Sequence, residues 1–508
     1  MIDITQISLT DKRTWDLICA GHTKGVFQLE THLGKHWCKE AKPRNIEELA
    51  DVISVIRPGT LKAIEEGKSM TQRYVDRKHN VESVKSLYEP IDKVIASTYN
   101  IIIYQEQAMQ IAQVMAGFTE SQADTLRKAI GKKKADLMRQ VKGEFIEGCL
   151  SRGHTQENAD RIFDIIEKSN RYSFNKSHAV SYALMAYWSA YLKANKTLEF
   201  YLHWLSNAKE KIDPNQEIYE LVESAKIDHI NIHTPYHEYI EENFSIQDEG
   251  IYFGITNVKN VGINEFLKLR DICAEVAPKT WMDYLIKVIP NVNKRAVENL
   301  ITVGFFSNLG KSRSEMQHEF SCLKDLTKKE LEILQEKLDT SISIKDNLKN
   351  LNRLKKEGGA VASTKRLVAF ADIINRLENP GRSLKDNLMS ISISEENLLG
   401  IAISCSKVDA CADASFANTT CKELMDGKKG KSILAVEITR IKEHVTKNKD
   451  KMAFLSIRDD SIEIENIVVF PEPFAKFEDI IYVGSTVLLF GEKAKDRNSF
   501  LVNDIHQI

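Results

Sequence analysis

Four side chains suited to binding a nucleotide stand close together in the sequence YSFNKSH: Tyr172, Phe174, Lys176 and His178. An aromatic ring can stack on a base, and a lysine can pair with a phosphate. The cluster precedes an apolar run with helical spacing, and the N–H groups and positive dipole end of a helix start attract phosphate. It therefore predicts a nucleotide site. The alternative is a capped core helix with surface polar residues at its start.

The apolar run after this cluster indicates which face of the expected helix is buried. Residues at steps of four, three and four are Val180, Leu184, Tyr187 and Tyr191. This spacing predicts one buried face. Ser177 is the predicted N-cap, because a serine oxygen can accept a hydrogen bond from an N–H of the first turn.

A basic run, RKAIGKKKADLMRQVK, is the second candidate for binding phosphate. Its seven bases are Arg127, Lys128, Lys132, Lys133, Lys134, Arg139 and Lys142, and the only acid within the run is Asp136. A solvated helical face is the usual meaning of such a run, and phosphate binding is the competing interpretation. The composition of the run leaves both open.

Two amphipathic helices are expected to position the first of these bases. The stretch YQEQAMQIAQVMAGF places one set of apolar side chains on a single helical face. The set is Tyr104, Ala108, Ile111, Met115 and Phe118. Gly117 marks the end of this helix, and Thr119 with Gln122 forms a capping box for the next. The second helix is expected to end before Gly131, so that its last turn presents Arg127. Upstream, Arg57 to Thr60 reads as a loop.

The sequence pattern changes after about Ile251, from long helical spacing to short apolar elements separated by turns. Two stretches, IYFGITNVKNVGINEFLKLR and NVNKRAVENLITVGFFSNLG, each contain a short apolar element, a turn and a helix. Such a unit presents backbone N–H groups that can hold one phosphate without reading a base. Residues from Ser314 to Ser390 read as a helical connector, with LTKKELEILQEKL as a helix and KEGGA as a break. Beyond Lys431, five runs with period two predict a small barrel of the oligonucleotide-binding (OB) kind, with a generic barrel as the alternative.

Composition narrows the class of protein. The chain has 508 residues, 43% of them hydrophobic, and a formal net charge of −2, which argues against a uniformly basic nucleic-acid coat. Its eight cysteines form no CxxC pair, and none has a histidine at zinc-finger spacing, so reduced thiols without a bound metal are expected. Apolar stretches are too short to span a membrane. A cytoplasmic protein without membrane partners is expected.

Several long motifs, in order, resemble the fingers region of C-family DNA polymerases, the alpha subunits of bacterial and phage DNA polymerase III. They are GVFQLE at Gly25, IRPG at Ile56, YVDRKH at Tyr74, YNIIIYQEQAMQIAQVMAGFTESQADTLRKAIGKKK at Tyr99 and FNKSHAVSYALMAYW at Phe174. The resemblance continues through the tandem helix-hairpin-helix region, ENLLGIAIS at Glu396 and the barrel. It covers the C-terminal half of that subunit, and only the connector lacks a recognisable match.

The resemblance implies roles for matched residues. Arg127, Lys128 and Lys132 would meet the triphosphate of the incoming nucleotide, although the family usually has a second arginine where this chain has Lys128. His178 would lie against the sugar and obstruct a 2′-OH, with Tyr172 or Phe174 near the nascent base pair. Lys176 completes the nucleotide-binding set, and Arg57, Tyr104 and Gln105 are either contacts or scaffold. The DNA-binding set is Gly254, Lys259, Val261, Gly262, Asn293, Lys294 and Arg295.

The resemblance also implies an organisation. The expected fold is multidomain and mainly α, followed by a small all-β OB-like barrel. The expected domains are a fingers region (1–208), a tandem helix-hairpin-helix domain (209–313), a helical connector (314–394), and a further connector with the OB domain (395–508).

The implied chemistry is template-directed DNA synthesis on primer-template DNA and dNTP. The family's metal-binding aspartates lie in a palm that precedes the stretch matched at Met1, and the chain has no Asp-x-Asp pair. We therefore expect no catalytic or metal-binding residue in this chain, and no bound cofactor. Magnesium would come with a palm-bearing partner polypeptide, and a sliding clamp is a further candidate partner. The alternatives are a noncatalytic DNA-binding protein and a helical scaffold.

Overall fold

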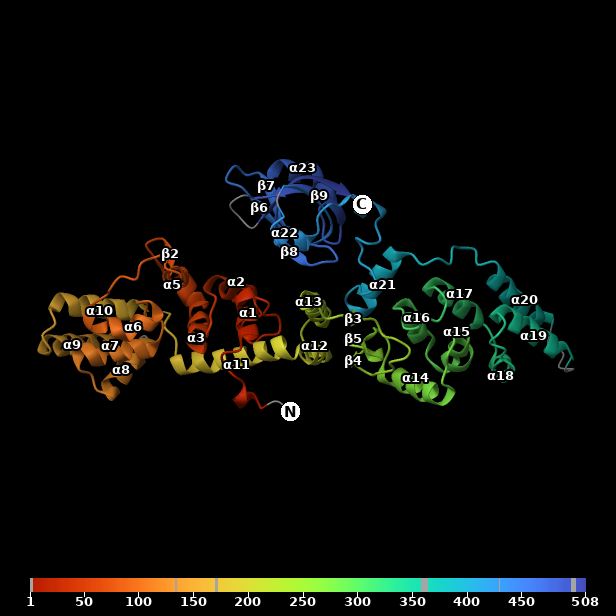
Figure 1. The fold of residues 1–508 in the computed structure, drawn as a ribbon, viewed down its shortest axis with the longest axis horizontal. Helices are drawn as coiled ribbons and strands as arrows, with labels where there is room; N and C mark the ends of the chain where they lie inside the picture. Colours follow the sequence, from red (N-terminus) through yellow and green to blue (C-terminus); the bar gives the residue numbers. More distant parts are fainter. Residues whose placement is uncertain (1–2, 133–134, 170–171, 358–363, 429, 495–498) are drawn as a thin grey trace. The chain divides into compact units, whose positions relative to one another are not determined.

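A computed structural model describes residues 3–132, 135–169, 172–357, 364–428, 430–494 and 499–508. The chain divides into two compact units, Met1–Phe200 and Tyr201–Ile508 (Figure 1). The four-domain division stays a prediction. Within the described residues, no helix combines the length and apolar character needed to cross a membrane.

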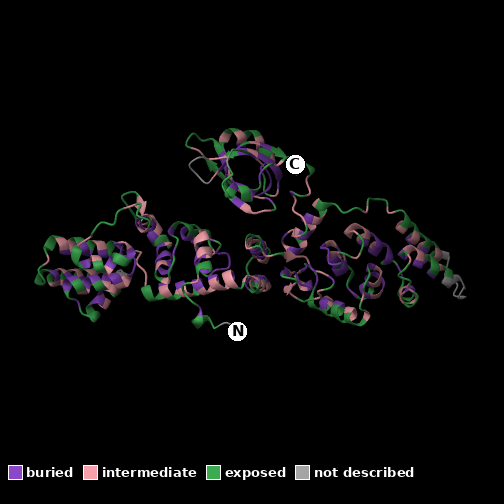
Figure 2. Cartoon of the chain, in the orientation of Figure 1, coloured by how far each residue is buried: buried purple, intermediate pink, exposed green. Residues whose placement is uncertain are grey.

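The described residues of the first unit are mostly helical, and they include a short hairpin of β1 (Ile64–Glu65) and β2 (Lys68–Ser69). Its principal helices are α1 (Lys12–Ala20), α2 (His32–Ala41), α3 (Ile46–Val55), α4 (Pro58–Lys62), α5 (Met70–Lys78), α6 (Glu89–Ile95), α7 (Gln105–Ala116), α8 (Glu120–Lys132), α9 (Ala135–Ser151), α10 (Gln156–Ser169) and α11 (Lys176–Asn195). Helix α12 (Thr197–Ser206) leads into the second unit. Figure 2 shows the buried stripes along these helices.

Two separate hydrophobic cores hold the first unit together. The first core is built by α1, α2, α3, α5 and α11. The second core is built by α6 to α10, which lie together at one end of the unit in Figure 1. Because α11 returns to the first core after the second has been completed, α6 to α10 form a subdomain inserted into the sequence of the first. We call it the inserted subdomain.

Helix α11 packs through small side chains. Its fully buried stripe includes Ala179, Ala183, Ala186 and Ala190. Such side chains let the backbones of α11 and α3 approach closely. The predicted stripe was one position away, and of its members only Tyr187 is fully buried. The predicted N-cap was also wrong: Asn175 Oδ1 accepts the His178 N–H at 2.9 Å, and Ser177 Oγ donates to the same oxygen at 2.7 Å.

Other local predictions in the first unit can be compared directly. The capping box is confirmed, with Thr119 N donating to Gln122 Oε1 at 3.0 Å. The predicted loop at Arg57 is instead the start of α4, because Pro58 occupies the first helical position, where its missing N–H does no harm. Helix α8 was expected to end before Gly131 and continues through Lys132.

The second unit begins with α13 (Pro214–Ile227) and a three-stranded sheet in the order β3-β5-β4. These strands are Ile232–His233, Gly250–Tyr252 and Ser245–Gln247. Further helices are α14 (Ile263–Val276), α15 (Trp281–Asp283), α16 (Lys294–Thr302), α17 (Arg313–Leu323), α18 (Lys328–Glu336), α19 (Ile344–Glu357), α20 (Thr364–Glu378), α21 (Leu388–Leu399) and α22 (Cys421–Met425). The predicted connector helix is present as α18, whose capping box joins Thr327 and Glu330. The expected break at KEGGA falls partly outside the described residues.

All five predicted strands are present, and they close into a barrel in the order β10-β8-β7-β6-β9. They are β6 (Lys431–Val445), β7 (Lys451–Arg458), β8 (Glu463–Val469), β9 (Thr486–Lys493) and β10 (Phe500–Gln507), with α23 (Pro471–Phe477) between β8 and β9. The pairing of β10 with β8 is parallel, and the other pairings are antiparallel. This fold is OB-like, so the predicted class, mainly α followed by a small barrel, is confirmed.

Charged side chains join the barrel to the helical part of the second unit. Lys407 Nζ lies 2.7 Å from Glu396 of α21 and 2.6 Å from Glu437 of β6. Arg458 of β7 lies 2.5 Å from the same Glu437 and stacks over Tyr219 of α13, 4.9 Å from the ring centroid. Each charge is therefore matched by an opposite one.

Candidate nucleotide and DNA interface

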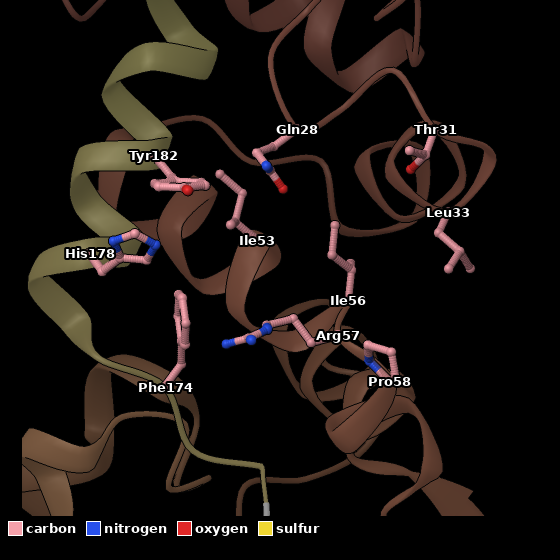
Figure 3. Close-up of a pocket in the computed structure, with 10 residues that line it drawn as sticks. All are labelled: Gln28, Thr31, Leu33, Ile53, Ile56, Arg57, Pro58, Phe174, His178 and Tyr182. Carbon is pink, nitrogen blue, oxygen red and sulfur yellow. The ribbon is translucent and has the colours of Figure 1, made fainter. Parts of the chain in front are cut away.

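A cavity of about 330 Å³ opens beside the start of α11 (Figure 3). Its lining comes from the loop before α2, the first turn of α2, the C-terminal end of α3 with the start of α4, and the segment just before α11 with the first two turns of that helix. The lining residues are Gln28, Thr31, Leu33, Ile53, Ile56, Arg57, Pro58, Phe174, His178 and Tyr182. Three of the predicted site residues, Arg57, Phe174 and His178, thus meet in one place.

Ring contacts hold one wall of the cavity. The Arg57 guanidinium lies over the Phe174 ring, 4.0 Å from its centroid, and Figure 3 shows the two pointing toward one another. The Phe174 and His178 centroids are 5.4 Å apart in an edge-on arrangement, and His178 and Tyr182 are 4.1 Å apart. Phe27 continues the series 5.0 Å from Tyr182. This wall offers faces and edges of tilted aromatic rings next to a positive charge, which suits a base or a sugar.

The start of α11 is already partly occupied. The Lys176 N–H donates to Glu106 Oε2 at 3.0 Å. The Lys176 ammonium lies 5.7 Å from the centroid of the Tyr104 ring. A carboxylate at this end of a helix satisfies an N–H group that the sequence prediction assigned to phosphate. His178 and Phe174 are therefore better placed at the cavity than Lys176.

Tyr172 and Phe174 differ in position. Tyr172 packs against the first core and is not among the residues that line the cavity, and burial raises the pKa of its hydroxyl well above the ordinary value. Phe174 lines the cavity directly. Residues two apart in regular extended backbone share a face, so the two rings differ because Tyr172 lies in the turn after α10, where its N–H donates to the Ser169 carbonyl at 3.0 Å.

Tyr104 and Gln105 belong to the framework of the site. Tyr104 is 1% exposed, and its hydroxyl donates to Asp51 Oδ1 at 2.6 Å. The Gln105 N–H donates to the Phe174 carbonyl at 2.9 Å. Burial raises the pKa of Asp51 to about 6, against the hydrogen bonds from Tyr104 and Tyr74. The sequence analysis missed Asp51, and also Gln28, whose place in the GVFQLE motif was a usable signal.

The basic end of α8 carries its own counter-charge. Arg127 donates to Asp124 Oδ1 from Nε at 2.9 Å and from Nη2 at 2.7 Å. Lys128 Nζ lies 2.6 Å from Asp124 Oδ2. Hydrogen bonds from Lys128 and Arg127 lower the pKa of this carboxyl. Arg127 and Lys128 remain 39% and 54% exposed, and neither lines the cavity.

Other bases of the run are also described in part. Arg139 pairs with Asp136, and Lys142 Nζ lies 2.9 Å from Asp164 of α10. Lys133 and Lys134 lie outside the described residues, and so does the side chain of Lys132. The bases described in this run therefore each have an acidic partner on the same or a neighbouring helix, which favours a solvated face except where a ligand displaces the partner.

In the first predicted hairpin, within the stretch IYFGITNVKNVGINEFLKLR, Gly254 and Gly262 differ in the space around them. A Cβ on Gly254 would lie 2.3 Å from the Asn243 carbonyl carbon, so this glycine allows close backbone packing. A Cβ on Gly262, the N-cap of α14, would meet nothing within 4 Å. Lys259 N donates to the Leu398 carbonyl at 2.9 Å, and Val261 is buried. Among these residues, the open start of α14 at Gly262 is best placed to receive a phosphate.

The second hairpin leads into α16. Asn293 caps this helix by accepting the Arg295 N–H at 2.9 Å, and its own N–H donates to Glu265 Oε2 at 2.7 Å. Lys294 Nζ lies 3.3 Å from the Lys324 carbonyl. Exposed Lys294 and Arg295 leave the start of α16 basic. Both hairpins therefore keep a helix start at the surface.

In the part of the chain that the structure describes, no three His, Cys, Asp or Glu side chains gather where they could hold a metal ion. The free thiols there include Cys38 and Cys421, which are buried. The source of magnesium for any reaction stays a prediction.

Comparison with known proteins confirms the resemblance. A family model described as the bacterial DNA polymerase III alpha subunit finger domain matches residues 1–153, and one described as a helix-hairpin-helix motif matches residues 229–316. The chain is 31% identical to DNA polymerase III subunit alpha of Aquifex aeolicus over 96% of its own length and 38% of the relative. For Pseudomonas aeruginosa these values are 30%, 97% and 42%, and for Staphylococcus aureus strain MSSA476 they are 29%, 100% and 44%. The chain thus spans about two fifths of the length of these relatives.

Proposed function

We propose that this chain, which is similar along nearly its whole length to part of the DNA polymerase III alpha subunit, supplies the nucleotide- and DNA-binding part of a C-family DNA polymerase. The single observation that carries the proposal is the cavity where Arg57, Phe174 and His178 meet at the start of α11. A palm-bearing partner polypeptide completes the enzyme.

The cavity and the basic end of α8 take different parts of the incoming dNTP. Phe174, backed by Arg57, offers a ring to the base, and His178 limits the space at the sugar 2′ position. Arg127 and Lys128 pair with the triphosphate after leaving Asp124. Because Lys128 is a point charge where the family usually has a forked guanidinium, its contact is expected to be less directional.

The reaction is phosphoryl transfer from the dNTP to the primer 3′-OH. Magnesium ions, held by the palm, supply activation of the 3′-OH and charge stabilisation of the leaving pyrophosphate. This chain contributes binding, orientation and exclusion of the ribonucleotide. Its helix-hairpin-helix region holds the primer-template through phosphates, without sequence preference.

Primer extension tests this function. The chain alone is expected to extend no primer, and the complex with the palm polypeptide is expected to do so. In that complex, His178→Ala should raise the efficiency for a ribonucleotide relative to its deoxynucleotide, because space replaces the imidazole. Ser181→Ala, on the next turn of α11, is the matched control and should leave the ratio unchanged. An unchanged ratio in a folded His178→Ala complex would show that the histidine is structural.

A noncatalytic DNA-binding function is the second candidate. It is favoured by the second unit, which combines the hairpins and the barrel in one compact body. Under this alternative the chain binds primer-template as tightly without nucleotide as with it. Under both candidate functions, the affinity for DNA should fall steeply as the salt concentration rises, because the contacts are to phosphates.

Deletion of 432–508 tests the contribution of the barrel. It should weaken binding of single-stranded template more than binding of duplex, because OB barrels offer stacking surfaces and a groove. Equal loss on both DNAs would contradict this assignment.

A further inference from the structure

The segment between α6 and α7 returns to the first core, and there it runs beside the segment that precedes α11. One ends at Ile103 and Tyr104, and the other contains Phe174. The Phe174 N–H donates to the Ile103 carbonyl at 2.8 Å, and the Gln105 N–H donates to the Phe174 carbonyl at 2.9 Å. These bonds form an isolated parallel bridge between Tyr104 and Phe174. The backbone on either side of Tyr104 is therefore hydrogen bonded directly to the backbone of Phe174.

A buried carboxylate fixes Tyr104 to the first core. Asp51 lies on α3, is 6% exposed, and accepts the Tyr104 hydroxyl at 2.6 Å and the Tyr74 hydroxyl at 3.0 Å. Both tyrosines are fully buried. Burying a carboxylate disfavours its charged form, and two hydroxyl donors compensate for this only in part. An apolar side chain would fill this part of the core without the free-energy cost of burying a carboxylate, so filling the core does not by itself explain Asp51.

Gln107 fixes the same segment from the other side. Its Oε1 accepts the N–H groups of Ile103 and Tyr104, each at 2.9 Å, and its Nε2 donates to Thr98 Oγ1 at 2.7 Å. Gln107 belongs to α7, a helix of the inserted subdomain. Tyr104 is consequently tied to the inserted subdomain through Gln107 and to the first core through Asp51.

We propose that Asp51 and Tyr104 are positioning residues for the nucleotide cavity. Asp51 holds the Tyr104 hydroxyl, the bridge carries this position to Phe174, and Phe174 in turn meets Arg57 and His178. The same anchor sets how the inserted subdomain, with Arg127 on α8, joins the first core. In its role in dNTP binding, this inference rests on the proposed function. The coupling of Asp51 to the backbone of Phe174 does not.

Tyr74 offers a matched control within the same cluster. It donates to the same carboxylate and is buried like Tyr104, but it lies on α5 and makes no bridge to Phe174. Removing either hydroxyl deprives Asp51 of one donor. If the cluster only stabilises the core, Tyr74→Phe and Tyr104→Phe have the same consequences.

The first measurement uses the full chain alone. Hydrogen exchange at the Phe174 and Gln105 amides should become about fivefold faster in Tyr104→Phe, the factor that corresponds to one lost net hydrogen bond. Tyr74→Phe should leave both amides within about twofold of the wild type. Equal acceleration in the two variants, or none in Tyr104→Phe, would overturn the coupling.

The second measurement uses the complex with the palm polypeptide. Tyr104→Phe should raise the KM for dNTP about fivefold or more and shift the ratio of ribonucleotide to deoxynucleotide use, with a smaller change in kcat, while Tyr74→Phe leaves both quantities near wild type. Asp51→Asn, which keeps an acceptor oxygen, should fall between them and serves if Tyr104→Phe does not fold. Faster exchange at Phe174 with unchanged KM and ratio would overturn the positioning role. A wild-type complex without activity would instead count against the proposed function, and the exchange result would still decide the coupling.

Discussion

The cavity beside α11 and the basic end of α8 are built in opposite ways. The cavity wall consists of rings and a guanidinium in mutual contact, anchored through the buried Asp51. The bases of α8 are exposed, and both rest on one carboxylate, Asp124. Under the proposed function, a base or sugar would have to fit a shape that already exists, whereas a triphosphate would only have to replace a weak ion pair. The first arrangement would then give selectivity, and the second would give adaptable attraction.

The strongest test of this comparison asks whether its two sides are separate folding units. Phe145→Ala removes a fully buried ring of the second core, which contacts Phe118 and Phe163, and should destabilise the inserted subdomain by about 3–5 kcal/mol. Hydrogen exchange should show protection lost in α7 to α10 and retained in α1 and α3. Val114→Ala, an exposed site on α7, is the control. Simultaneous loss of protection in both cores would show that they are not separate folding units.

Asp51 predicts a pH dependence on the cavity side. Its folded pKa, about 6, is raised above the ordinary value of 3.8, so its charged form opposes folding. The stability linked to its protonation is complete below pH 4 and is lost as the pH rises through 6. Asp51→Asn removes this term. Relative to wild type, the variant should therefore lose up to ~3 kcal/mol as the pH falls from 7 to 4, measured by urea unfolding. A constant difference would show that Asp51 does not titrate in this range.

Arg127→Ala tests the exposed bases of α8, which are proposed to bind the triphosphate. In the complex with the palm polypeptide it should weaken binding of deoxynucleotides and ribonucleotides alike, by about 1–3 kcal/mol if the contact is charge-assisted and desolvated. The ratio of the two should not change. Arg139→Ala, in the same basic run and paired with Asp136, is the matched control and should have little effect. If Arg127→Ala changed the ratio of ribonucleotide to deoxynucleotide use, Arg127 would take part in sugar selection, and the cavity and α8 would not have separate roles.

The smallest expected effect belongs to Asp124→Asn. The pair is exposed, so stability should change by no more than about 0.5 kcal/mol. Because Arg127 and Lys128 no longer have to leave a carboxylate, the KM for dNTP should fall slightly, by about twofold or less. A large rise in KM would mean that Asp124 orients the bases for the triphosphate.

The spacing of apolar and polar residues correctly predicted the features that depend only on nearby residues in the sequence. The amphipathic face of α7, the Thr119–Gln122 capping box and five barrel strands all follow from spacing within a few residues. The face of α11 was misjudged because alanines carry a weak hydrophobic signal, although their small size is what brings α3 close. The N-cap was misjudged because Asn175 and Ser177 are both good caps, and sequence spacing does not choose between them.

Site residues were predictable where a motif contained them and unpredictable where the fold had to bring them together. Phe174, His178 and Arg57 came from motifs, and the structure brings them to one cavity. Asp51 stands in the middle of an apolar helix, and its partner Tyr104 is 53 residues away in sequence. No local pattern reports such a pair, because a buried acid and an exposed one look alike in sequence.

The insertion of α6 to α10 between the parts of the first core has a consequence for how the protein is made. Helix α3, which buries Leu49, Val52 and Ile53 in the first core, packs against α11, and α11 leaves the ribosome only after the whole inserted subdomain. At roughly 5–20 residues per second, translation from Val55 to Lys176 takes on the order of ten seconds. During that interval the inserted subdomain can complete its own core, while α3 still exposes its apolar face. The nascent chain should therefore be most open to chaperone binding at α3, and this opportunity should end when α11 emerges.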